Sequence, residues 1–177
     1  MDELQLIADE WGIPIIEDAA HAVGAKYKGV DIGSLSDFTM FSFQAIKHIT
    51  TGDGGMLIIK NKELVDKAER IRWFGIDRNS KQAGIWENDI TEVGYKYQMT
   101  DIDAAMGIAS LSEFDNQSKL RKELFEAYEL ELSNCDRVKV VGGGFSDREH
   151  AAWLFTVLVE DRYKLQKKLR DNYIESN

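Results

Sequence analysis

Apolar positions along the first 60 residues alternate between helical and strand spacing. Residues 2–11 carry apolar side chains at the intervals of one helical face, namely Leu4, Ile7, Ala8 and Trp11. Gly12 follows as a typical helix stop. Mostly apolar runs at 13–17, which ends in Glu17, at 38–43 and at 56–59 predict three short buried strands. A helix, a turn and buried strands in succession indicate an α/β fold with a mainly parallel sheet.

Polar and turn-forming segments separate the predicted elements in the middle of the chain. Residues 24–37 are rich in turn formers and predict a loop or a small hairpin. Asn61 is expected to cap a helix that continues through Trp73. Residues 77–95 are polar and irregular, which indicates an excursion on the surface. Thr100 then opens a further helix, because Asp103 stands three positions later as in a capping box.

The last third of the chain has a pattern of its own. A long charged helix reaches about Asn134, and its apolar positions are expected to point inward: Leu120, Leu124 and Tyr128. A strand at 137–141, a second strand at 152–160 and a helix at 161–174 follow. The chain is therefore predicted to form two domains, residues 1–115 and residues 116–177.

Charge and composition exclude several classes of partner. The 177 residues include 22 basic and 31 acidic side chains, a formal charge of −9, which disfavours nonspecific binding to nucleic acid or to an anionic membrane. The single cysteine, Cys135, leaves no internal disulfide framework and fits a reducing compartment. No apolar run is long enough to span a bilayer, and the acidic N-terminus is unlike a signal peptide. We therefore expect a cytoplasmic protein.

Residues that could take part in catalysis follow two of the predicted strands. Asp18 follows the first strand and Lys47 follows the second, so a parallel arrangement would bring a buried carboxylate and an amine to one edge of the sheet. A lysine amine forms a Schiff base with an aldehyde, and a carboxylate keeps a pyridine nitrogen protonated. Ser42 adds a hydroxyl at the same strand end, and the glycines after Lys47 suit a close approach to phosphate. These are the requirements of pyridoxal phosphate (PLP).

Simpler interpretations remain open for the same residues. Asp18 would equally serve as a strand-end cap, His21 as an ordinary loop histidine and Lys47 as a solvated lysine. The GDGG segment at 52–55 would equally form a hairpin turn. A metal site made by Glu17 with Asp18 and His21 is disfavoured, because no further histidine or cysteine is placed to complete the ligand set.

Three segments resemble consecutive signatures of one enzyme family. They are IIEDAAHAVGAKYKG, GSLSDFTMFSFQAIKHITTGDGGML and VGYKYQMTDIDAAMG. In this order and spacing they are similar to the DegT-type PLP-dependent sugar aminotransferases. The resemblance implies the aspartate aminotransferase-like fold, with residues 1–115 as the second half of the PLP-binding large domain. Residues 116–177 would then form the linking helix and an incomplete small domain.

The resemblance also implies roles for individual residues. Lys47 matches the lysine that binds the cofactor aldehyde and moves protons, and Asp18 matches the carboxylate on the pyridinium nitrogen. His21 matches a position near the cofactor ring, and Ser42 matches a serine on the phosphate. The GYKYQM loop matches one that reaches the phosphate of a neighbouring subunit in a homodimer. Lys96 stands there in place of the family's frequent asparagine.

The implied reaction moves an amino group, with glutamate as the expected donor, to a keto sugar on a nucleotide carrier, for amino-sugar and polysaccharide biosynthesis. Family members with histidine in place of the lysine dehydrate the sugar instead, so Lys47 favours aminotransfer. Family enzymes are about twice as long, which makes the chain resemble a central fragment. A PLP-dependent sugar dehydratase and a noncatalytic interaction module of the same fold are the alternatives.

Overall fold

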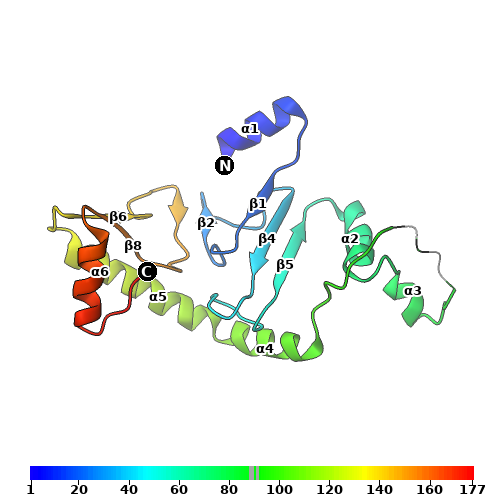
Figure 1. Ribbon diagram of the computed structural model, residues 1–177. Helices are drawn as coiled ribbons and strands as arrows, with labels where there is room; N and C mark the ends of the chain where they lie inside the picture. The colour runs from blue at the N-terminus through cyan, green and yellow to red at the C-terminus, as the bar shows by residue number, and fades with distance from the viewer. Residues whose placement is uncertain (88–89, 91) are drawn as a thin grey trace.

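A computed structural model describes residues 1–87, 90 and 92–177. Its central element is a three-stranded sheet with the order β1-β4-β5, formed by β1 (Ile16–Asp18), β4 (Phe38–Ser42) and β5 (Gly55–Ile59). β1 and β4 are parallel, whereas β4 and β5 are antiparallel. The expected α/β class is confirmed, with the local difference that β5 returns beside β4 instead of continuing the parallel order (Figure 1).

Helix α1 (Asp2–Trp11) precedes this sheet as the apolar spacing predicts. It ends because Gly12 adopts a left-handed conformation, with φ of 61°, and its N–H bonds back to the carbonyl oxygens of Ala8 and Asp9. The predicted first strand is shorter than the apolar run, since only Ile16–Asp18 pairs with β4. The predicted helix end at Gly12 is thus confirmed, whereas β1 begins later than the predicted strand.

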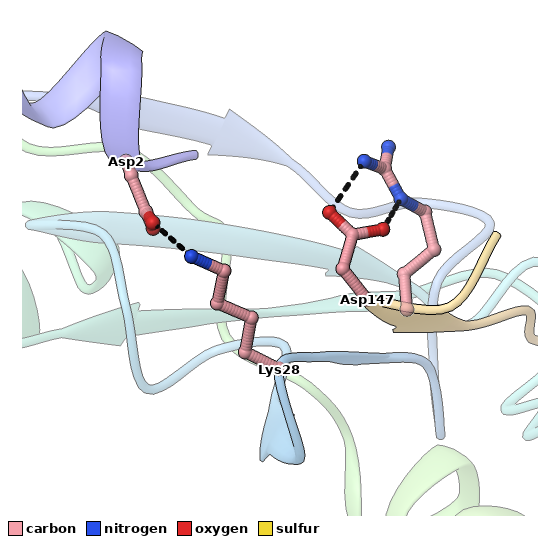
Figure 2. A network of polar contacts seen from close by, with 4 residues as sticks. Asp2, Lys28 and Asp147 are labelled. Carbon is pink, nitrogen blue, oxygen red and sulfur yellow. Dashed lines mark hydrogen bonds and ion pairs between the residues drawn. The ribbon is translucent and has the colours of Figure 1, made fainter.

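A second sheet joins distant parts of the chain. The expected hairpin forms from β2 (Lys26–Tyr27) and β3 (Val30–Asp31), and β7 (Arg148–Glu149) pairs with the other side of β2. Figure 2 shows the charges beside it: Lys28 meets Asp2, and Arg148 meets Asp147. The Lys28 backbone N–H also donates to the Asp147 carbonyl at 2.6 Å. This backbone bond and the β2–β7 pairing attach the 147–149 segment to the first third of the chain.

The remaining helices follow the capping signals. Asn61 accepts from the Glu63 N–H and starts a short 3₁₀ turn (Lys62–Leu64) that continues as α2 (Val65–Arg72). Within the predicted irregular stretch, Asp77 caps a short helix, α3 (Arg78–Gln82), and the part of that stretch at 88, 89 and 91 lies outside the described residues. The structure therefore confirms the Asn61 cap and adds one helix.

Two helices run past the end of the three-stranded sheet as a nearly continuous rod (Figure 1). They are α4 (Asp101–Ser112), which has the expected Thr100–Asp103 capping box, and α5 (Phe114–Leu132). Beyond them, β6 (Val138–Val141) and β8 (Thr156–Val159) form an antiparallel pair beside α6 (Arg162–Asp171). No helix among the described residues is long and apolar enough to cross a membrane.

The buried core is small for a chain of this length. Among the residues that the structure describes, six apolar side chains are buried: Ala8, Ala19, Phe43, Phe125, Ala151 and Ala152. On α5 the one fully buried side chain is Phe125, which meets Phe155 edge-to-face with ring centroids 4.9 Å apart. Phe114, at the start of the helix, is half-buried and lies edge-to-face with His48. The expectation that Leu120 and Leu124 point inward is wrong in this structure, since both are 58% exposed, whereas Tyr128, 47% exposed, does stack on Phe155 with ring centroids 4.9 Å apart. The β6–β8 unit covers the Phe125 face and leaves the two leucines in solvent.

Candidate active site

The candidate site lies where β1 and β4 end. Asp18 is the last residue of β1 and stands in register with Met40, and Ser42 ends β4 two residues later. The Ala19 N–H still donates to the Met40 carbonyl at 2.9 Å, so the pairing continues just beyond Asp18. Because the two strands are parallel, the carboxylate and the hydroxyl lie at the same edge of the sheet.

Asp18 differs from expectation in its burial. Its side chain is exposed, and Oδ1 accepts the Ala20 N–H at 3.1 Å. The half-buried carboxylate is that of Glu17, whose Oε2 accepts hydrogen bonds from Ser36 at 3.0 Å and Thr39 at 3.3 Å. The prediction of a buried carboxylate at position 18 is therefore wrong in this structure, because alternation along β1 turns Glu17 toward the buried hydroxyls and Asp18 away from them.

Lys47 stands on the turn that connects β4 to β5, residues 43–54. Three backbone hydrogen bonds brace this turn: Phe43 N–H to Gly54 O at 2.8 Å, Thr51 N–H to Phe43 O at 2.9 Å, and Lys47 N–H to Gln44 O at 2.9 Å. The hydroxyl of Thr50 also donates to the Phe43 carbonyl at 3.3 Å. A half-buried lysine therefore projects from a backbone with little freedom to move.

The glycines after Lys47 have a structural use in this turn. A Cβ on Gly55 would lie 2.7 Å from the Phe41 carbonyl oxygen, and one on Gly54 would lie 2.3 Å from the Thr51 hydroxyl oxygen. β4 and β5 are antiparallel neighbours, so the GDGG segment belongs to a hairpin connection, which was one of the two interpretations left open by the sequence. Close packing of the two strands thus accounts for Gly54 and Gly55 without a phosphate.

Trp153 completes the cluster and was missed by the sequence reasoning. Its ring stacks on His21, with ring centroids 3.6 Å apart and an interplanar angle of 17°. The Lys47 Nζ lies 4.3 Å from the centroid of the Trp153 ring, and the indole N–H donates to the Ile46 carbonyl at 3.2 Å. The Trp153 side chain thereby contacts both His21, just after β1, and the turn that carries Lys47. Nothing local to Trp153 in the sequence signals this contact.

His48 anchors the same turn from below the surface. It is buried, and its Nε2 lies 2.8 Å from the carbonyl oxygen of Ala151. A carbonyl oxygen can only accept, so Nε2 carries the proton. Burial lowers the pKa of His48, and the bond to Ala151 opposes that change only in part. Positive charge at Arg121 lowers the pKa further.

The other expected site residues are placed as follows. The Ser42 Oγ accepts the Gln44 N–H at 3.3 Å and is half-buried. In the GYKYQM loop, Tyr95 stacks on Tyr97 with ring centroids 5.1 Å apart, and Lys96 is exposed. The described residues contain no group of three or more His, Cys, Asp or Glu side chains that could hold a metal ion.

Solved sugar aminotransferases superpose on nearly the whole chain, so its mixed α/β fold is that of the large domain of this class of PLP enzymes. The chain belongs to the DegT/DnrJ/EryC1/StrS aminotransferase family, whose model matches residues 1–177.

Individual relatives support the same assignment. The UDP-4-amino-4,6-dideoxy-N-acetyl-beta-L-altrosamine transaminase of Campylobacter jejuni (serotype O:23/36) is 39% identical over 132 residues, which are 75% of this chain and 34% of that protein. The sugar aminotransferase CalS13 from Micromonospora echinospora superposes with a TM-score of 0.90 at 30% identity, covering 98% of this chain and 48% of that one. The PLP-form of the putative sugar aminotransferase Spr1654 from Streptococcus pneumoniae gives 0.81 at 31% identity, covering 93% and 43%. The chain spans less than half the length of each.

Proposed function

We propose that this chain carries the lysine-bearing part of a PLP-dependent sugar aminotransferase. The observation that carries the proposal is the convergence of two strand ends. Asp18 ends β1 and His21 follows it, Lys47 follows β4, and Trp153 contacts both His21 and Lys47. A braced turn presents the lysine, as a reacting amine requires. The family membership and the sugar aminotransferases that superpose on the chain support the same activity.

The residues at this edge fit pyridoxal phosphate by their chemistry. When bound to a lysine and paired with a carboxylate, PLP supplies an electron sink that stabilises negative charge on the substrate carbon. Lys47 would bind the aldehyde carbon and afterwards move a proton with its free amine. Asp18 would pair with the ring nitrogen, and its carboxylate is exposed to a ligand while Ala20 orients Oδ1. His21 would flank the ring, and Ser42 would donate to the phosphate.

The substrate side of the proposal rests on the relatives. The Campylobacter relative is named for a UDP-linked amino sugar, so we assign a nucleotide-linked keto sugar as the amino acceptor. Glutamate is the proposed amino donor, and the product would serve polysaccharide biosynthesis. The assembly would be a homodimer in which the GYKYQM loop, with Lys96 exposed, reaches the phosphate of the other subunit. The single cysteine is consistent with a cytoplasmic location.

The test is direct labelling of Lys47. The protein is mixed with PLP, its visible absorbance is recorded, the mixture is reduced with borohydride, and peptides are analysed by mass spectrometry. We expect the reduced pyridoxyl phosphate group on the Lys47 peptide, because this amine is half-buried on a rigid turn. Lys47→Met should lose the label, whereas Lys60→Met, at an exposed lysine beyond β5, should keep it. An unlabelled Lys47 in the wild type would refute the proposal for this chain.

A second measurement separates aminotransfer from the alternatives. Addition of glutamate to the PLP-loaded protein should convert the absorbance to that of pyridoxamine phosphate. Asp18→Asn should still be labelled at Lys47 but should convert slowly, because the ring nitrogen loses its charged partner. A dehydratase would retain the label without conversion by glutamate, and a noncatalytic module would show neither.

A further inference from the structure

Trp153 occupies a position that its local sequence does not explain. It follows β7 and precedes β8, yet its ring lies against His21 and beneath the Lys47 amine, at 3.6 Å and 4.3 Å from the ring centroid. Resting on the function proposed above, we propose that Trp153 is a positioning residue that orients the Lys47 side chain for reaction with the cofactor aldehyde.

The backbone before Trp153 is held in an unusual conformation. Ala152 has a φ of 53°, in the left-handed region that residues with a Cβ seldom adopt. Its N–H donates to Nδ1 of His150 at 2.8 Å, and the preceding carbonyl, of Ala151, accepts from His48 at 2.8 Å. Both alanines are buried. Strain of this kind persists where neighbouring contacts over-determine the backbone, and it clusters at functional sites.

These contacts aim the indole at the lysine turn. The indole N–H donates to the carbonyl of Ile46, the residue immediately before Lys47. The ring is therefore tied to the same backbone that carries the amine, and the His21 stack holds the ring from the β1 side. Two independent supports fix the plane of the ring relative to Lys47.

The fixed ring acts on a side chain that is otherwise flexible. A lysine has a four-carbon stem with many rotamers, and the braced turn restrains only its backbone. A positively charged nitrogen within about 6 Å of an aromatic centroid is attracted to the ring face, and Lys47 Nζ lies well inside that range. The Trp153 ring consequently selects the rotamers that keep the amine over the indole that stacks on His21, which is the support that a precise site requires from its surroundings.

The experiment uses two substitutions that differ only in the ring. Trp153→Phe and Trp153→Leu both lose the bond to the Ile46 carbonyl, but only phenylalanine keeps an aromatic face. The probe is acetic anhydride at limiting concentration, with the acetylated fraction of each lysine read by mass spectrometry and no cofactor present. We expect Lys47 acetylation in Trp153→Leu to rise roughly three- to tenfold over wild type, and in Trp153→Phe to stay within about twofold.

The matched control is Trp86→Leu. Trp86 is 74% exposed, and the Nζ of Lys81 lies 5.5 Å from the centroid of its ring. The substitution therefore removes a lysine–indole contact of the same kind away from the site. This variant should leave Lys47 acetylation unchanged. Both Trp153 variants should still unfold in one cooperative thermal transition, which separates the effect of the ring face on Lys47 from a failure to fold.

Labelling with PLP and borohydride then tests the positioning role itself. Trp153→Leu should label Lys47 roughly three- to tenfold less than wild type at limiting PLP, and Trp153→Phe should restore most of the label. Equal behaviour of the phenylalanine and leucine variants, or wild-type behaviour of the leucine variant, would overturn the proposal. If wild-type Lys47 takes no label while acetylation responds as expected, the aminotransferase function fails and the orienting contact stands without its proposed use.

Discussion

His48 and Ala151 are joined by a hydrogen bond of 2.8 Å across 103 positions of the sequence. The bond attaches the segment that carries Trp153 to the turn that carries Lys47. Its donor is a buried imidazole whose pKa is lowered, first by burial and further by the positive charge of Arg121 and by His150 and His21. Burial therefore favours the neutral imidazole at this link, while the bond to Ala151, which Nε2–H donates in either protonation state, opposes that preference only in part.

The lowered pKa of His48 predicts how the stability of the folded chain depends on pH. The unfolded chain binds a proton at His48 more readily than the folded chain, because the folded pKa lies below the ordinary value of 6.5. The free energy of unfolding should thus be fully retained above pH 6.5 and should fall as the pH drops from there toward the folded pKa. Urea unfolding on both sides of this pH measures the effect.

His48→Gln is the matched variant, because glutamine keeps an N–H donor for the Ala151 carbonyl but does not titrate. It should flatten the pH dependence relative to wild type. An identical slope in the two proteins would contradict the assignment of the pH dependence to His48.

Helix α4 approaches the lysine turn through Gly107. A Cβ at this position would lie 2.9 Å from the Cγ2 methyl of Thr51, which is 3% exposed. Gly107→Ala should destabilise the protein by about 1 kcal/mol, because overpacking of roughly 1–3 kcal/mol exceeds the helix propensity gained from alanine. Urea denaturation measures the difference.

Thr51→Ser removes that methyl and keeps the hydroxyl that donates to the Asp53 carbonyl at 3.0 Å. In a double-mutant cycle, Thr51→Ser with Gly107→Ala should be more stable than the sum of the two single changes by about 1 kcal/mol. Additive effects would show that the two positions do not touch in solution.

The N-terminal cap of α4 should be measurable on its own. The Thr100 Oγ1 accepts the Asp103 N–H at 3.2 Å, and the Asp103 carboxylate accepts the Thr100 N–H at 3.2 Å. Thr100→Ala should cost about 1 kcal/mol of unfolding free energy, because the Asp103 N–H loses its acceptor and the Asp103 carboxylate loses the hydroxyl that donates to it. Thr100→Ser should retain most of it in the same urea titration, and equal losses in both variants would exclude the cap as the cause.

The aromatic cluster on α5 predicts a contrast between adjacent residues. Phe125 is 8% exposed and contacts Phe155, whereas Leu124 is 58% exposed. Phe125→Ala should cost about 3–5 kcal/mol, and Leu124→Ala should change stability by less than about 0.5 kcal/mol. Chemical denaturation compares them, and a comparable loss for Leu124→Ala would mean that another surface covers that face of α5 in solution.

Local signals determined one end of three helices and the end of one strand, whereas α3 was not expected from them. The stop at Gly12, the cap at Asn61 and the capping box at Thr100 involve atoms within four residues of each other, so their sequence spacing is enough to predict them. The placement of Ser42 at the end of β4, with Lys47 on the turn that follows, also agrees with the apolar run that precedes it.

The tertiary structure alone decided the rest. Three features depend on which distant segments pack against each element. They are the antiparallel direction of β5, the exposure of Asp18 beside a half-buried Glu17, and the outward direction of Leu120 and Leu124. Trp153 illustrates the reason most clearly, since its bond to Ile46 spans 107 positions. A hydrophobic pattern records that a side chain is apolar and at what spacing, but only the folded chain selects the partner that it meets.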